Sequence, residues 1–251
     1  MKLADVPELN GPAELSGRAW RWPDRIDDLR ERFLSAQPYP HIVIDDSFEP
    51  DLLARVYDDI PLPANPAWTR WGGGRPEECN PENSKRGISD MSKLPPSIAA
   101  VLEGLISPPF IEDLRALTGV SELVTDRTLS GGGLHCSGRG AALRLHADPI
   151  RHPSPADFDQ AINLILYINP HWSVDYEGEL ELWSRDCSTQ VVSIAPLFNR
   201  MVVFQADRST YHGHPRPNRC PEGCWRTSLA LYYYVPRQHR VELQSNRPLW
   251  R

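Results

Sequence analysis

A dense series of short strand patterns fills the second half of the sequence and restricts the fold more than any other feature. From about residue 121, runs of β-branched, aromatic and aliphatic residues recur between Gly, Pro and Asp turns. These runs cover 143–146, 161–169, 179–183, 189–194, 200–205 and 227–235. Because no long helical pattern separates them, a parallel doubly wound sheet is excluded and a sandwich or barrel is favoured. The 25 prolines agree with a fold rich in turns.

The first 120 residues predict helices that support this β core. Apolar spacing near 3.6 residues favours helices over 26–34, 52–60, 97–105 and 109–117. A strand is predicted at 41–46, and Ser47 is the expected N-cap of the helix that follows it. Residues 64–94 show neither strand nor helix periodicity, and we expect a long loop there.

Length and charge limit the partners of the chain. Its 251 residues predict one domain at 38–240, with a peripheral segment at 1–37 and a tail at 241–251. The net charge of −6 and the lack of a Lys/Arg block disfavour nucleic acid and anionic membranes, so a small molecule is the expected ligand. The sequence lacks an apolar secretory signal, and no apolar stretch approaches the ~20 residues of a spanning helix. We expect a cytoplasmic protein and allow for a homodimer.

The cysteines favour a reducing compartment. There are five, an odd number. Cys220 and Cys224 are close in sequence, but no second Cys or His pair with zinc spacing accompanies them. We therefore expect free thiols.

Three features of the β region could form one chemical site. His146 and Asp148 lie at the end of a predicted strand, where positions i and i+2 point to one side. His212 and His214 follow the apolar strand 201–204, and Arg226 opens the strand after them. Two histidines and one carboxylate form the facial arrangement of non-haem Fe(II) oxygenases. An arginine nearby can bind a carboxylate through two parallel hydrogen bonds from its guanidinium group, a bidentate interaction.

Each residue also has a structural interpretation. His146 can be a polar residue at a strand end, and an Asp before proline is a common turn residue. The two later histidines, next to prolines, can form a solvated loop, and Arg226 can be a surface charge. These interpretations stay open on the residues alone. That all of them hold at once, for residues in this order, is less expected than that the residues form one site.

The sequence resembles the 2-oxoglutarate and Fe(II)-dependent oxygenases of the prolyl 4-hydroxylase-like branch over roughly residues 38–236. The resemblance is carried by PHIVIDD (40–46), DRTLSGGGLH (126–135), LHAD (145–148), NLILYIN (163–169), GELELW (178–183), APLFNR (195–200), YHGHP (211–215) and RTSLALYYY (226–234). It implies a mainly β fold with supporting helices around a double-stranded β-helix, the jelly-roll core of cupin-like proteins.

The resemblance also implies roles for individual residues. The implied iron ligands are His146, Asp148 and His212. Arg226 would bind the distal carboxylate of 2-oxoglutarate, Tyr167 would donate a hydrogen bond to it, and Ser228 would assist. Strand alternation is compatible with these roles, because residues 163, 165 and 167 share one face and residues 226, 228 and 230 share another.

The chain departs from the family pattern in two places. Glu177 stands before Gly178 where the family usually has a second glycine, and the path from His212 to Arg226 is lengthened by the insert 217–224. His214 competes with His212 as the second histidine ligand. We favour His212, because the family motif places its ligand before the glycine.

The implied activity is that of a dioxygenase that uses Fe(II), 2-oxoglutarate and O2 to hydroxylate a small molecule such as an amino acid, sugar or natural-product intermediate. Asp148 favours hydroxylation, although desaturation or ring closure needs the same ligands. Residues that could contact the substrate are His135, Arg144, Arg151, Trp172 and His214. The alternatives are a cupin-like metal enzyme that does not use 2-oxoglutarate and a jelly-roll carbohydrate-binding module, which would explain the tryptophans.

Overall fold

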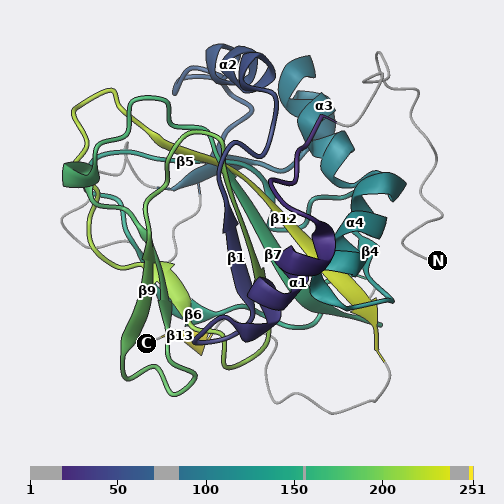
Figure 1. The fold of residues 1–251 in the computed structure, drawn as a ribbon. Coiled ribbons are helices and arrows are strands. Elements are labelled where there is room, and N and C mark those ends of the chain that lie inside the picture. Colours follow the sequence, from purple (N-terminus) through teal and green to yellow (C-terminus); the bar gives the residue numbers. More distant parts are fainter. Residues whose placement is uncertain (1–18, 71–84, 155–156, 238–248, 251) are drawn as a thin grey trace.

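The computed structural model describes residues 19–70, 85–154, 157–237 and 249–250 (Figure 1). Its strands form two antiparallel sheets. The longer sheet contains β1 (His41–Ile44), β2 (Thr69–Arg70), β3 (Arg86–Ile88), β4 (Val124–Thr125), β5 (Gly133–Ser137), β7 (Phe158–Tyr167), β10 (Arg200–Gln205) and β12 (Arg226–Pro236). The shorter sheet contains β6 (Leu143–Ala147), β8 (Leu180–Trp183), β9 (Gln190–Ile194), β11 (His212–His214) and β13 (Leu249–Trp250).

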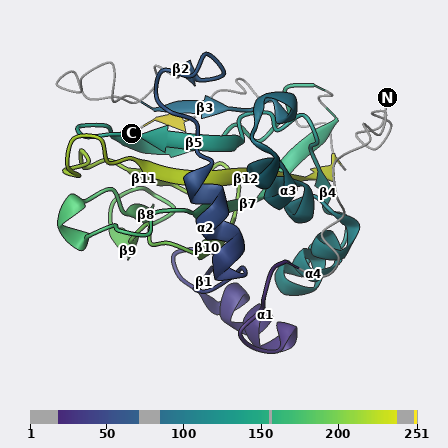
Figure 2. The ribbon, with the colours of Figure 1, turned by 90° about the horizontal axis from the view of Figure 1, so that it is seen from above.

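The strand order shows how distant segments meet. The longer sheet follows the order β1-β10-β7-β12-β5-β3-β2, with β4 also paired to β12. Figure 2 shows these strands one after another across the molecule. The shorter sheet follows β13-β6-β11-β8-β9. Neighbours in each sheet are thus often far apart along the chain, as in a barrel-like β fold rather than a row of hairpins.

Helices cover one side of the longer sheet. They are α1 (Ile26–Ser35), α2 (Pro50–Asp58), α3 (Pro96–Leu105) and α4 (Pro108–Thr118), with short 3₁₀ helices at Met91–Lys93 and Val174–Tyr176. In Figure 1, α1, α3 and α4 lie on the side of the sheet opposite to β6, β9 and β13. Gly119, with a φ of 75°, ends α4 in the left-handed conformation that glycine favours. No helix in the described part of the chain is long and apolar enough to cross a membrane.

The two central strands β7 and β12 divide the core into two sides. Leu164 and Leu166 on β7, with Leu229 and Leu231 on β12, belong to the large apolar cluster that includes the helices. The alternate residues, among them Ile165 and Tyr167, face the other sheet. The predicted alternation is therefore confirmed. It leaves one face of each strand for the core and the other for a cavity.

The predicted mainly β fold with supporting helices is confirmed, but two local predictions were wrong. Ser47 does not cap α2, which begins at Pro50 with Glu49 in the cap position. The Ser47 hydroxyl is buried and donates to Asn199 instead, since the cap lies two residues further along. Segment 64–94 is not all loop, because it contributes β2, β3 and a 3₁₀ helix.

Some predictions lie outside the described residues. These cover residues 1–18 of the peripheral segment 1–37, residues 71–84 of the expected loop, most of the tail 241–251, and Cys79. The other four cysteines are thiols outside any disulfide bond, as predicted. Cys220 donates its S–H to the carbonyl oxygen of Cys224 at 3.3 Å and belongs to no metal-binding group among the described residues.

Candidate metal centre and carboxylate pocket

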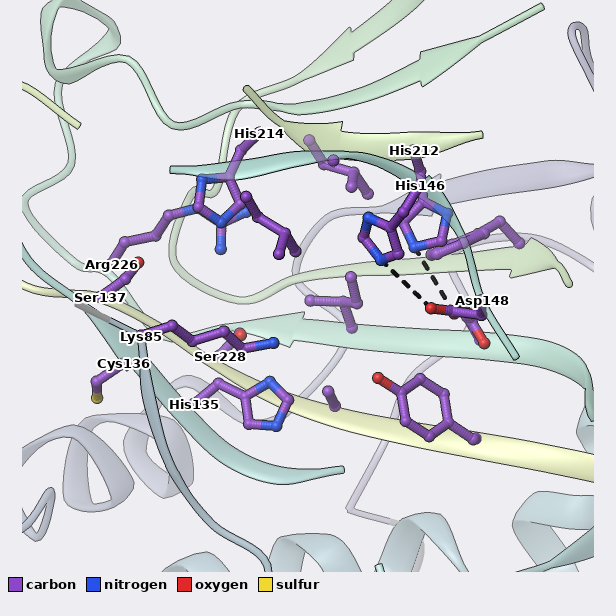
Figure 3. Close-up of a pocket in the computed structure, with 18 residues that line it drawn as sticks. Lys85, His135, Cys136, Ser137, His146, Asp148, His212, His214, Arg226 and Ser228 are labelled. Carbon is purple, nitrogen blue, oxygen red and sulfur yellow. Dashed lines mark hydrogen bonds and ion pairs between the residues drawn. The ribbon is translucent and has the colours of Figure 1, made fainter. Parts of the chain in front are cut away.

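A cavity of about 80 Å³ lies between the two sheets (Figure 3). Residues of β6 and β11 line it from the shorter sheet, and residues of β5, β7 and β12 line it from the longer one. His146, Asp148 and His212 lie at one end, while Arg226 and His214 lie toward the other (Figure 3). The cavity therefore joins the three predicted metal ligands and the predicted anion-binding arginine.

The two candidate ligand histidines form a cross-strand pair. His146 on β6 lies opposite His212 on β11, and their ring centroids are 4.5 Å apart. The strands approach closely beside this pair, because a Cβ at Gly213 would lie 2.8 Å from the carbonyl oxygen of Leu143. Only glycine fits there. The register also shifts, so that three steps on β6 match two on β11.

Hydrogen bonds set the tautomer of both rings. The Nδ1 atom of His146 lies 2.9 Å from the carbonyl oxygen of Arg144, and Nδ1 of His212 lies 3.0 Å from that of Thr210. A carbonyl oxygen only accepts, so each Nδ1 carries the proton and each Nε2 keeps a free lone pair. The two Nε2 atoms lie 3.3 and 3.7 Å from the carboxylate oxygens of Asp148.

Asp148 is oriented by two amides of β7. Asn163 donates from Nδ2 to Oδ2 of Asp148 at 2.7 Å, and Gln160 donates from Nε2 to the same oxygen at 3.2 Å. Burial raises the pKa of Asp148, but His212, His146 and Asn163 outweigh it and hold the pKa well below its ordinary value. Burial also lowers the pKa of His212 to about 4, although Asp148 opposes this. At neutral pH the carboxylate is charged and the imidazole is neutral.

These properties fit a divalent metal such as iron. The ligand atoms of His146, Asp148 and His212 all lie within 4.8 Å of one another, and no other such group occurs among the described residues. Two imidazoles that present Nε2 to the same point and one ionised carboxylate are the donor set of the facial triad. The carbonyl and amide partners behind them hold the donors in place.

Arg226 is buried and held by the loop before β8 and by β7. Its Nε donates to the carbonyl oxygen of Gly178 at 2.7 Å, and its Nη2 donates to the hydroxyl of Tyr167 at 3.0 Å. Only 8% of Arg226 is exposed. Gly178 has a φ of 82°, and a Cβ there would lie 3.3 Å from Cδ of Arg226. Burial raises the pKa of Tyr167 although Arg226 opposes it, so the hydroxyl keeps its proton. The pair can serve as a carboxylate-binding fork.

The insert between His212 and Arg226 packs against the loop after β5. Asn218 is 2% exposed. Its backbone carbonyl oxygen accepts from the N–H of Gly140, and its backbone N–H donates to the carbonyl oxygen of Ala141. Its side-chain amide donates to the carbonyl oxygen of Gly138 at 3.2 Å. Arg139 donates to the carbonyl oxygens of Arg219 and Cys220, both at 2.9 Å. The insert is therefore fixed at its centre, and β12 begins with Arg226 in the cavity.

The remaining candidates fall into two groups. His135 and His214 are buried and line the cavity. His214 lies outside the group of three ligand atoms, so the geometry favours His212 as the ligand. Arg144, Arg151 and Trp172 do not line the described cavity. Arg144 is exposed, and the backbone of Arg151 forms an isolated β-bridge with that of Asp159. Trp172 packs on Tyr176 and donates to the carbonyl oxygen of Glu177.

Sequence reasoning missed four residues at the site. Asn163 and Gln160 hold Asp148, Lys85 lines the cavity, and Trp250 of β13 packs on His146 with ring centroids 4.9 Å apart. Strand alternation could have found Asn163, because it placed this residue on the face of Tyr167. Neither Lys85 nor Trp250 lies in a periodic segment, so no sequence signal indicated them.

Comparisons with known proteins agree with this geometry. Residues 132–234 match the model of the 2OG-Fe(II) oxygenase superfamily, a span that contains the three candidate ligands and Arg226. No curated protein matches the chain.

Solved structures share the fold. A prolyl hydroxylase from Trichoplax adhaerens, in complex with a hypoxia inducible factor peptide fragment, has 16% identity and a TM-score of 0.55, covering 84% of this chain and 89% of its own. A Pseudomonas putida prolyl-4-hydroxylase has 14% identity and a TM-score of 0.55, and the match covers 84% of this chain and 98% of the hydroxylase. The alpha-ketoglutarate-dependent epimerase SnoN from nogalamycin biosynthesis has 11% identity and a TM-score of 0.56, and the match covers 89% of this chain and 94% of the epimerase.

The fold is therefore the double-stranded β-helix of 2-oxoglutarate oxygenases, as the resemblance implied. The match to the 2OG-Fe(II) oxygenase superfamily model spans the site itself, and the solved structures share the fold around it. The reaction and substrate of this chain are separate questions, since one fold hosts many functions.

Proposed function

We propose that the protein is a 2-oxoglutarate- and Fe(II)-dependent dioxygenase that hydroxylates a C–H bond of a small molecule in the cytoplasm. The observation that carries this proposal is one buried cavity that contains both the His146, Asp148 and His212 group and the guanidinium of Arg226. A site for a metal alone has no need of the arginine. A dicarboxylate that binds the metal through one end and Arg226 through the other would use both groups.

Each residue has a defined task in this proposal. Nε2 of His146, Nε2 of His212 and the carboxylate of Asp148 would hold the iron. When bound with 2-oxoglutarate and O2, the iron supplies oxidative decarboxylation of the 2-oxo acid coupled to C–H oxidation. Arg226 and the Tyr167 hydroxyl would bind the distal carboxylate, assisted by Ser228 on the same face of β12. The aliphatic side chains beside them exclude water from the cavity.

The substrate class rests on weaker support than the cofactors. SnoN belongs to the biosynthesis of nogalamycin, whereas the Trichoplax enzyme was solved with a peptide. The small enclosed cavity and the net charge of −6 support a small molecule here. His135 and His214, which line the cavity, are the residues that we propose to contact it.

Anaerobic titration tests the proposal. We expect the purified protein with Fe(II) and 2-oxoglutarate to give the weak visible charge-transfer band of the chelate, and to form succinate slowly in air. His146→Ala and Asp148→Ala should abolish the band. Arg226→Ala should keep it but require at least ten times more 2-oxoglutarate. Arg144→Ala, at an exposed residue outside the cavity, is the matched control.

The result also separates the alternatives. Metal binding without the band or succinate would indicate a cupin-like metal enzyme that does not use 2-oxoglutarate. Absence of both metal and 2-oxoglutarate binding would refute the proposal and leave a binding module. The band in the wild-type protein, lost in the ligand variants, would support the dioxygenase.

A further inference from the structure

Tyr232 lines the cavity between the two sheets, although neither the candidate metal centre nor the carboxylate pocket uses it. It lies on β12, where the alternate residues Arg226, Ser228, Ala230 and Tyr232 all line the cavity. Tyr232 comes six residues after Arg226, which corresponds to about 20 Å along an extended strand. Figure 3 shows Arg226 and Asp148 at opposite ends of the cavity. The strand therefore leads away from the carboxylate pocket toward Tyr232.

The cross-strand neighbour of Tyr232 places it at the metal end. Tyr232 pairs with Asn163 of β7, and both residues line the cavity. Side chains paired in this way have Cβ atoms about 5 Å apart. Asn163 donates to Asp148 at 2.7 Å, so the tyrosine lies beside the amide that holds a candidate metal ligand. A group bound by Tyr232 would thus lie close to the metal centre.

The turn before β5 packs against the ring of Tyr232. Gly131 in this turn has a φ of 75°, and a Cβ added there would lie 3.1 Å from Cε2 of Tyr232. That distance is shorter than an ordinary contact between carbon atoms, so the ring packs directly on the backbone of the turn. Tyr232→Phe keeps the ring and therefore keeps this packing.

The hydroxyl of Tyr232 makes no hydrogen bond within the described part of the chain. Other tyrosines of the core do make one. The Tyr39 hydroxyl donates to the carbonyl oxygen of Tyr211 at 2.9 Å. The Tyr233 hydroxyl donates to the carbonyl oxygen of Leu105 at 3.0 Å. A polar group without a partner in a cavity indicates a partner that arrives with a ligand.

The phenol of Tyr232 is a neutral donor. A phenol is protonated at neutral pH, and burial raises the pKa of Tyr232 well above its ordinary value, as does the charge of Asp148. Arg226 and Tyr167 already form a pocket for one carboxylate at the far end of the cavity. A molecule that enters beside the metal centre therefore meets an uncharged O–H on β12.

We propose that Tyr232 donates a hydrogen bond to an uncharged oxygen of the substrate beside the metal centre. This inference rests on the proposed function and gives a chemical class to its substrate, a small molecule with a hydroxyl, ether or carbonyl oxygen near the C–H bond that reacts. The phenol could instead meet the carboxylate of 2-oxoglutarate next to the metal, and the experiment separates these two sources.

The first arm uses two neutral probes of the same size. Tetrahydrofuran has an oxygen that accepts a hydrogen bond, and cyclopentane has the same five-membered ring without it. Each is added to the 251-residue chain loaded with Mn(II) and saturated with 2-oxoglutarate, and broadening of its proton signals reports binding near the metal. We expect tetrahydrofuran to broaden about fivefold more than cyclopentane in the wild type, the effect of one neutral hydrogen bond.

Variants assign this difference to one hydroxyl. Tyr232→Phe removes only the hydroxyl and should make the two probes broaden equally. Tyr57→Phe is the matched control, because Tyr57 is 41% exposed on α2, and it should keep the wild-type difference. Circular dichroism and melting curves verify that each variant is folded. The second arm measures the dissociation constant of 2-oxoglutarate for the same Mn(II) proteins by calorimetry, and we expect Tyr232→Phe to stay within threefold of the wild type.

Each outcome decides the question. Loss of the tetrahydrofuran preference in Tyr232→Phe, with 2-oxoglutarate affinity kept, assigns the phenol to the substrate. A loss of 2-oxoglutarate affinity greater than threefold assigns it to the cosubstrate and overturns the inference. Equal broadening of the two probes in the wild type, or an unchanged difference in Tyr232→Phe, also overturns it. If the wild type fails to bind 2-oxoglutarate, the proposed function fails, and the two probes on the Mn(II) protein alone still test Tyr232.

Discussion

Glu177 occupies a backbone conformation that favours glycine, and replacing it should stabilise the protein. Its φ is 57° and its ψ is −158°, a region that residues with a Cβ rarely adopt. The residue directly precedes Gly178, whose carbonyl oxygen accepts from Arg226. This position is also where the sequence departs from the family pattern that it resembles, by lacking a second glycine. Glu177→Gly therefore tests the strain and the turn behind Arg226 together.

Three contributions decide the magnitude. Relief of the backbone strain at Glu177 should stabilise by about 1–3 kcal/mol. Loss of its surface ion pairs, with Arg216 at 2.8 Å and with Arg219 at 3.9 Å, costs about 0–1 kcal/mol, since Arg216 keeps Glu179 and Glu181 as partners. Added freedom of the unfolded chain costs about 0.5–1 kcal/mol. We expect a net stabilisation of about 1 kcal/mol.

Equilibrium unfolding in urea measures this change, with Glu177→Ala as the control. Alanine loses the same ion pair but keeps a Cβ at positive φ, so it should be less stable than the wild type by up to about 1 kcal/mol. The dissociation constant of 2-oxoglutarate should stay within twofold in both variants, because Gly178 still holds Arg226. A glycine variant no more stable than the alanine variant would refute the strain.

Two further predictions concern buried polar contacts. Asn163→Ala removes the 2.7 Å hydrogen bond to Asp148 and should weaken Mn(II) binding about 10- to 100-fold in a titration followed by paramagnetic resonance; an unchanged affinity would contradict this role. Burial raises the pKa of Asp126, but hydrogen bonds from Thr128, His152 and Ser130 hold it below its ordinary value. The stability that the charged Asp126 contributes is therefore present above pH ~4 and lost as the pH falls. Asp126→Asn should lower the free energy of unfolding by about 1–3 kcal/mol at pH 7. It should also reduce the fall of that free energy at acid pH, measured by urea unfolding at a series of pH values. Parallel curves for both proteins would count against it.

The sequence predicted most of the β core because local patterns determine it. Apolar alternation on β7 and β12 follows directly from the pleat, so the inward faces of Tyr167 and Arg226 could be predicted before any contact was known. The predicted grouping of His146, Asp148 and His212 also agrees with their positions, since strand ends next to turns are visible in the sequence.

The rest depended on irregularities that no periodicity shows. The extra residue on β6 separates Arg144 from the face of His146, although simple alternation puts them together. A similar register shift of β12 against β7 lets Gln160 reach Asp148 alongside Asn163. Lys85 reaches the cavity from the start of β3, a contact set by strand order rather than by local sequence pattern.

The insert between His212 and Arg226 has a consequence for detecting such proteins. Asn218 and Arg139 fix it against the β5 loop, and β12 begins with Arg226 in the cavity although the connection is long. The strands that hold His212 and Arg226, rather than the number of residues between them, bring the two groups into one cavity. A search that requires a fixed number of residues between the second histidine and the arginine will overlook such chains. A search that scores the cross-strand neighbours of each residue will retain them.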